Sequence, residues 1–113
     1  MSKIGKFTPR YRVPIGDTGY VAVVVECSAR TEKDYSRALD ASRSADGRLD
    51  GMELFRLAVD LVVDHLVGFE DADRNPVPGV DATAEWLEEN LTMSAIFELA
   101  REVRQVGIPK AKG

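Results

Sequence analysis

The first part of the chain has a pattern that predicts a β-hairpin. Apolar or aromatic side chains at Phe7, Tyr11 and Val13 alternate with Arg10 and Arg12, which is the two-residue period of a half-exposed strand. The turn sequence PIGDTG follows, and its glycines can adopt positive φ. The next segment, YVAVVVEC, is apolar without alternation, so we expect a strand that is covered on both faces or paired centrally in a sheet.

Helical periodicity begins near Thr31, which we expect to be an N-cap, and the first helix is predicted to end near Ser44. The strongest pattern runs from about Asp50 to Val67. It contains two apolar stripes and one narrow polar line, so this helix is apolar around most of its circumference. We expect it to be buried on two sides or to leave one side for a partner. The first stripe holds Met52, Phe55, Val59, Val62, Val63 and Leu66, and the second holds Leu54, Leu57, Ala58 and Leu61.

Two shorter helices are predicted in the last third of the chain. Asp81 or Thr83 caps the first, a break is expected over residues 90–92, and the second spans 93–106 before Gly107 and Pro109 end it. The predicted fold is therefore α+β and mostly helical, with an N-terminal β-hairpin followed by about four α-helices. We expect a single domain over residues 1–113, with a hairpin at 1–28, a helical bundle at 31–106 and a basic tail at 107–113.

The composition is typical of a soluble globular protein, with 44% hydrophobic and 30% charged residues. No apolar run approaches the roughly 18 residues that a membrane-spanning helix needs. The segment MSKIGKF is not followed by the apolar run of a secretory signal, so we expect a cytoplasmic protein without a membrane partner. Cys27 is the only cysteine, which excludes intrachain disulfides and multi-thiolate zinc sites; we expect it to be a small buried hydrophobe.

The net charge of −4 is unevenly distributed along the sequence. Residues 1–16 carry +4 and residues 101–113 carry +3, which leaves −11 for the segment between them. Basic ends could contact phosphates, and a basic N-terminal β-ribbon in a dimer would make the chain a small nucleic-acid-associated regulatory protein. The acidic body would repel nucleic acid, so we hold this function as the alternative.

The loop at residues 71–75 resembles the start of a calcium-binding loop, because Asp71, Asp73 and Asn75 occupy alternate positions. Counting from Asp71, the sixth position is Pro76 where a glycine is needed for the sharp turn. The twelfth is Ala82 where a bidentate glutamate is needed. The sequence therefore argues against a calcium site, and we expect no metal or cofactor.

The only histidine, His65, gives a third hypothesis. With Asp60 and Asp64 it could form part of a metal-dependent hydrolase site. A histidine near a helix end also interacts favourably with the C-terminal dipole, and this structural interpretation is favoured. The sequence contains no phosphate-binding, nucleophile-elbow or zinc-protease motif. We therefore expect a protein that is not an enzyme.

Three short phrases stand out in the second half of the chain: Val67, Gly68 and Phe69, then Asn75, Pro76, Val77 and Pro78, then Thr83. Their order resembles that of tail assembly chaperones of long-tailed bacteriophages. In that family a long apolar helix ends in a short phrase with glycine and an aromatic residue, passes through an acidic loop with two prolines, and enters a helix with threonine near its start. Phenylalanine stands here where tryptophan is common, and asparagine where glycine is.

The resemblance implies a protein that binds the long, hydrophobic tape-measure protein during tail assembly, keeps it soluble and helps to recruit tail-tube subunits. It also implies the host-cell cytoplasm if the chain is encoded by a virus or prophage. Such a role needs apolar surface on a soluble, charged body. Burial within the bundle and a homo-oligomer interface remain open for the same surface. The residues predicted to bind protein are Leu54, Leu57, Leu61, Leu99 and Val106.

Overall fold

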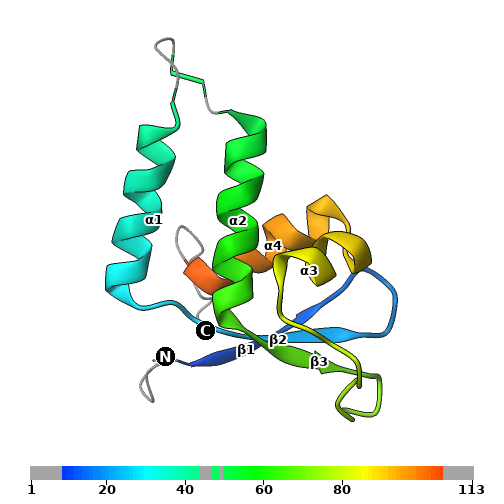
Figure 1. The fold of residues 1–113 in the computed structure, drawn as a ribbon. Coiled ribbons are helices and arrows are strands. Elements are labelled where there is room, and N and C mark those ends of the chain that lie inside the picture. Colours follow the sequence, from blue (N-terminus) through cyan, green and yellow to red (C-terminus); the bar gives the residue numbers. More distant parts are fainter. Residues whose placement is uncertain (1–8, 44–46, 49, 106–113) are drawn as a thin grey trace.

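The structure, a computed structural model, describes residues 9–43, 47–48 and 50–105. All the helices in this part of the chain lie on one side of an antiparallel sheet (Figure 1). The predicted α+β class, with an N-terminal hairpin and four helices, is confirmed. The elements in chain order are β1 (Arg10–Pro14), β2 (Val21–Val25), α1 (Ala29–Ala41), α2 (Gly51–His65), β3 (Leu66–Glu70), α3 (Ala84–Asn90) and α4 (Met93–Arg104).

β1 and β2 form the predicted hairpin, with Arg10 opposite Val25 at its open end. The connecting turn uses glycine at the two positions where the backbone is left-handed: Gly16 has φ 53° and Gly19 has φ 87°. A side chain would strain either position, whereas glycine adopts this conformation freely. The prediction that glycines with positive φ form the turn of the hairpin is therefore confirmed.

β2 is the central strand, between β1 and β3. Ala22 and Val24 belong to the core beneath the helices. Val23 and Val25 alternate with them along the strand and are buried as well. The absence of apolar–polar alternation in the sequence is explained by this central position, because both faces of the strand are covered.

A third strand lies where the sequence predicted the end of a helix. α2 stops at His65, and Leu66 has an extended backbone with φ −83° and ψ 121°. The following residues pair with β2, with Gly68 opposite Val23. The prediction that the helix continues to Val67 is therefore wrong. The free edge of β2 provides hydrogen-bond partners that the helical pattern of this segment did not reveal.

α1 begins three residues before the position expected from the sequence. The Ser28 hydroxyl accepts a hydrogen bond from the Thr31 N–H at 3.2 Å, so Ser28 is the N-cap and Thr31 lies inside the first turn. The predicted cap at Thr31 is therefore wrong, because the helix begins three residues earlier, where Ser28 accepts one of its free first-turn N–H groups. α2 is capped in a similar way, by the Asp50 carboxylate, which accepts from the Met52 N–H at 3.0 Å.

The last two helices agree closely with the sequence. Thr83 caps α3 and Thr92 caps α4, and Leu91 between them is extended, so the predicted break is confirmed. α4 ends at Arg104, and Gln105 then takes a left-handed conformation with φ 55°. The expected stop signals Gly107 and Pro109, like the basic tail, lie outside the described residues.

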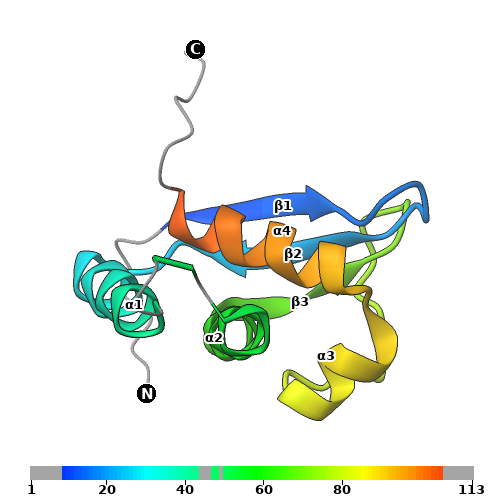
Figure 2. The same ribbon diagram turned by 90° about the horizontal axis from the view of Figure 1, so that it is seen from above.

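The core is the layer between the sheet and the helices. α4 lies over β1 and β2, and α2 packs against α4 and reaches β2 (Figure 2). α3 packs against α2 at the edge of this layer. The largest fully buried side chains come from a strand and three of the helices: Val24, Val59, Val62, Leu87, Ile96, Leu99 and Val103.

Candidate protein-binding surface

The five residues predicted to bind protein do not form one surface. Leu61 and Leu99 are buried in the core, and Leu54 and Leu57 are half-buried. Val106 lies outside the described residues. In this structure the two buried leucines contact a client only if the helices separate, because α4 turns Leu99 toward the sheet and α2 turns Leu61 toward the core.

The exposed apolar surface of α2 lies instead on the stripe that contains Met52 and Phe55. Met52 is 71% exposed, and Phe55 is half-buried. The Phe55 ring packs edge-on against Phe97 of α4, with 5.7 Å between the ring centroids. Phe55 is therefore held in place from behind while part of its side chain stays accessible.

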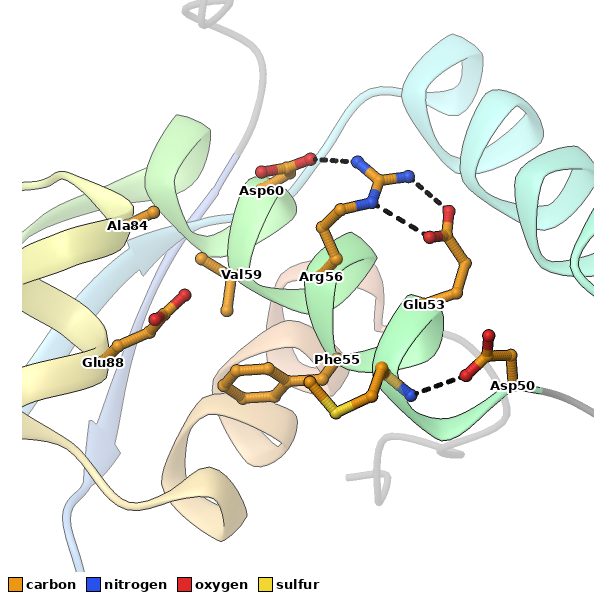
Figure 3. A pocket seen from close by; sticks show the side chains of 9 residues that line it. Asp50, Glu53, Phe55, Arg56, Val59, Asp60, Ala84 and Glu88 are labelled. Carbon is orange, nitrogen blue, oxygen red and sulfur yellow. Dashed lines mark hydrogen bonds and ion pairs between the residues drawn. The ribbon is translucent and has the colours of Figure 1, made fainter.

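Met52 and Phe55 line an open hollow between α2 and α3 with a volume of about 420 Å³. Its floor also includes Val59, one turn further along α2. Figure 3 shows Glu88 and Ala84 of α3 on the side facing Phe55 and Val59. The accessible part of the apolar floor is formed by Met52 and Phe55 along about one turn of α2, because Val59 is only 2% exposed, and a second helix forms one wall.

The rim of the hollow is acidic. Among the described residues, Asp50, Glu53, Asp60 and Glu88 border it, against one basic side chain, Arg56. Arg56 donates through Nε to Glu53 at 3.1 Å and through Nη1 to Asp60 at 3.0 Å (Figure 3). The hydrogen bonds between Glu53 and Arg56 lower the pKa of Glu53 and raise the pKa of Arg56. The single cation is thus shared by two carboxylates, and the rim keeps a net negative charge.

The hollow can therefore hold apolar side chains and attract cationic ones. Its described lining residues are apolar and charged side chains that can contact another protein, and none of them is a nucleophile paired with a general base. Met52 and Phe55 were not among the contact residues predicted from the sequence, because those on this helix were all taken from the other apolar stripe, at Leu54, Leu57 and Leu61. The sequence feature that could have indicated them is the position of Met52 in the first turn of the helix, where few core residues are near enough to cover it.

The acidic loop after β3 has a structural explanation. The Asp71 carboxylate accepts backbone N–H groups from Asp73 at 2.9 Å and Asn75 at 3.0 Å, and Arg74 between them has φ 69°. Asp71 is thus occupied in closing the turn. Among the described residues, no group of three or more histidine, cysteine or acidic side chains is arranged to hold a metal ion.

The candidate hydrolase residues are engaged in local contacts. His65 Nδ1 lies 2.8 Å from the Leu61 carbonyl oxygen, so this nitrogen carries the proton in that hydrogen bond. Asp60 binds Arg56 as described above, and Asp64 is exposed on the helix surface. His65 and Asp60 thus make hydrogen bonds within α2, and the described residues of the hollow include no histidine paired with a carboxylate.

The basic strand of the hairpin is partly neutralised. Arg12 of β1 donates to both carboxylate oxygens of Glu70 on β3, at 2.9 and 3.2 Å. This ion pair crosses the sheet face opposite the helices, above β2. Arg12 is therefore already paired with a carboxylate, so the ribbon presents less positive charge to a phosphate backbone than the sequence indicates.

Comparisons of this chain with protein-family models, curated proteins and solved structures find no match. Within the described part of the chain, no helix is long and apolar enough to cross a membrane. The functional proposal below is based on the hollow between α2 and α3 and on the charged residues at its rim.

Proposed function

We propose that the protein is a phage tail assembly chaperone that binds the tape-measure protein and keeps it soluble during tail morphogenesis. The proposed role requires no catalysis or cofactor and belongs to the cytoplasm of the host cell. The sequence resemblance described above suggests the family. The structural observation that supports it most is Met52, a large apolar side chain that is 71% exposed beside the half-buried Phe55.

This observation fits the role for a physical reason. A chaperone for an apolar helical client must offer apolar contact area and still remain soluble itself. Here the apolar floor of the hollow is small and bordered by carboxylates. The acidic rim keeps this part of the molecule hydrated, and the methionine can adapt its shape to different client side chains.

The test is co-expression with the tape-measure protein of the phage or prophage that encodes the chain. We expect the chain to keep a tape-measure fragment in the soluble fraction, and we expect Met52→Asp to abolish this effect. Because Met52 is exposed, the variant should remain folded, with unchanged circular dichroism and cooperative unfolding. Leu61→Asp would be a poor choice, since it places a charge in the core.

The matched control is Tyr20→Asp. Tyr20 is also a large apolar side chain, 48% exposed, but it lies in the hairpin and does not line the hollow. This variant should keep the fragment soluble as the wild type does. If the fragment precipitates in the presence of the wild-type chain, the proposed function is wrong.

A further inference from the structure

We infer that the hollow between α2 and α3 binds a basic amphipathic helix of the client, with apolar side chains on the floor and lysine or arginine facing the acidic rim. The inference rests on the proposed function and adds to it the chemistry of the bound segment. It is carried by the shape of the floor, the charge of the rim and the residues that form each.

The floor matches one face of a helix in length. Met52 and Phe55 are three residues apart on α2, so the accessible strip is about 5 Å long; Val59, the next residue of the floor, is only 2% exposed. A partner helix presents apolar residues over the same distance at positions i and i+3 or i+4. A short stretch of an amphipathic helix therefore covers the strip.

The two accessible residues of the floor differ in how firmly they are held. The Phe55 ring is supported by Phe97, whereas Met52 at the open end of the strip is largely solvent-exposed. A fixed aromatic contact beside a flexible, polarisable methionine suits a binding site that accepts leucine, methionine or phenylalanine anchors of different shapes. We therefore expect the apolar pattern of the client to matter more than one particular side chain.

The negative charge of the rim favours basic residues next to the apolar anchors of the client helix. Four carboxylates and one guanidinium border the hollow, and the guanidinium is already bonded to Glu53 and Asp60. Within the described part of the chain, the Glu88 carboxylate has no hydrogen bond or ion pair, and α3 exposes Glu85 and Glu89 beside it. An acidic or neutral helix would gain nothing from this wall, whereas lysine or arginine about one turn from the anchors gains a carboxylate partner.

The binding test uses two synthetic helical peptides with the same leucine positions, at i, i+4 and i+7. One carries lysines on the flanking positions and the other carries glutamates. Fluorescence anisotropy of the labelled peptides with the full chain should show binding of the lysine peptide. The affinity should fall as salt is raised, and the glutamate peptide should bind at least about tenfold more weakly.

Three variants locate the binding. Glu88→Lys should weaken the lysine peptide at least about fivefold and strengthen the glutamate peptide, because the charge of the wall is reversed. Met52→Asp should weaken both peptides, because it removes the apolar contact. Asp34→Lys is the matched control, since Asp34 is an exposed acid on α1 away from the hollow, and it should leave the ratio of the two affinities unchanged.

Several outcomes would overturn the inference. These are equal binding of both peptides, binding of neither, or an affinity that Glu88→Lys leaves unchanged. Self-association that covers the hollow, seen in sedimentation and lost in Glu88→Lys, would also overturn it by making a second copy the occupant. If the tape-measure fragment is kept soluble but neither peptide binds, the inference fails and the proposed function stands. If the lysine peptide binds selectively but the fragment is not kept soluble, the binding preference of the hollow stands and the proposed function fails.

Discussion

The ion pair between Glu32 of α1 and Arg104 of α4 joins segments that are 72 residues apart. Arg104 Nε and Nη2 each donate to one carboxylate oxygen of Glu32 at 2.7 Å. The guanidinium carbon lies 4.6 Å from the centroid of the Tyr35 ring, and the Ser36 hydroxyl donates to Glu32 at 2.9 Å. Tyr35 is the only buried residue of α1 among those described, so this cluster is the main attachment of the helix at its N-terminal half.

Replacing Glu32 by glutamine should lower the free energy of unfolding by about 1.5–2 kcal/mol. A hydrogen bond to a charged group contributes about 1.5–3 kcal/mol. The two side chains keep exposed fractions of 21% and 22%, which places the effect at the lower end of that range. Glutamine retains the shape of the side chain, so the loss reports the charge of the pair and not a cavity.

The same variant makes a pH-dependent prediction. The hydrogen bonds from Arg104 lower the pKa of Glu32 below its ordinary value of 4.5, against the opposing effect of partial burial. A carboxylate with a depressed pKa in the folded state stabilises the protein above its unfolded pKa, and this contribution is lost as the pH falls through the folded value. The difference between wild type and Glu32→Gln should therefore be constant from about pH 6 to 8 and shrink below about pH 4.5.

The assay is urea unfolding followed by circular dichroism at several pH values. The matched control is Glu53→Gln, which removes a glutamate that also pairs with an arginine, but within one exposed helix surface. The control should change stability little. The reasoning is refuted if both variants lose the same stability, or if the Glu32→Gln difference persists unchanged into the acid range where both states are protonated.

Three further predictions concern single side chains. Leu87→Ala should lower the free energy of unfolding by about 2–5 kcal/mol in the same urea assay, because Leu87 is fully buried and its loss leaves a cavity. Thr83→Ala should cost about 1 kcal/mol by removing the α3 cap, whose hydroxyl accepts the Trp86 N–H at 3.2 Å, and Thr83→Ser should restore most of it. Cys27 should react with a disulfide reagent only slowly until urea unfolds the chain, because it is buried and burial raises the pKa of its thiol; rapid labelling of the native protein would contradict this.

The features that could be predicted from the sequence depend on neighbours along the chain. The glycine turn of the hairpin, the cap at Thr83 and the break near Leu91 each require only a few adjacent residues. The cap of α1 was placed at Thr31 because serine and threonine are both good N-caps and both occur there. Choosing Ser28 requires knowing where the chain leaves β2, since that sets the first helical turn.

β3 could not be predicted because its pairing partner is distant in sequence. Val21, the first residue of β2, is opposite Glu70. Leu66 also continues the apolar stripe of α2, so periodicity alone favours a longer helix. Pairing with the free edge of β2 outweighs that local preference, as tertiary context often does for short strands.

The sequence does not decide which stripe of α2 is exposed, for a similar reason. A helix that is apolar around most of its circumference gives two candidate faces of equal quality. The choice is made by the packing of α2, because α4 contacts the first stripe at Phe55 and the same stripe is buried further along at Val59 and Val62. Met52, one turn before Phe55, is left exposed.

The positions behind the family resemblance acquire a structural role in this fold. Phe69 packs against Trp86, with 5.7 Å between ring centroids, and Thr83 caps the helix that carries Trp86. The Val77 N–H donates to the Phe69 carbonyl at 2.9 Å, which ties the acidic loop back to β3. These contacts fix α3, and α3 carries Glu88 to the rim of the hollow. The resembling phrases therefore act at a distance from the proposed contact, by holding the acidic wall against which a basic helix would lie.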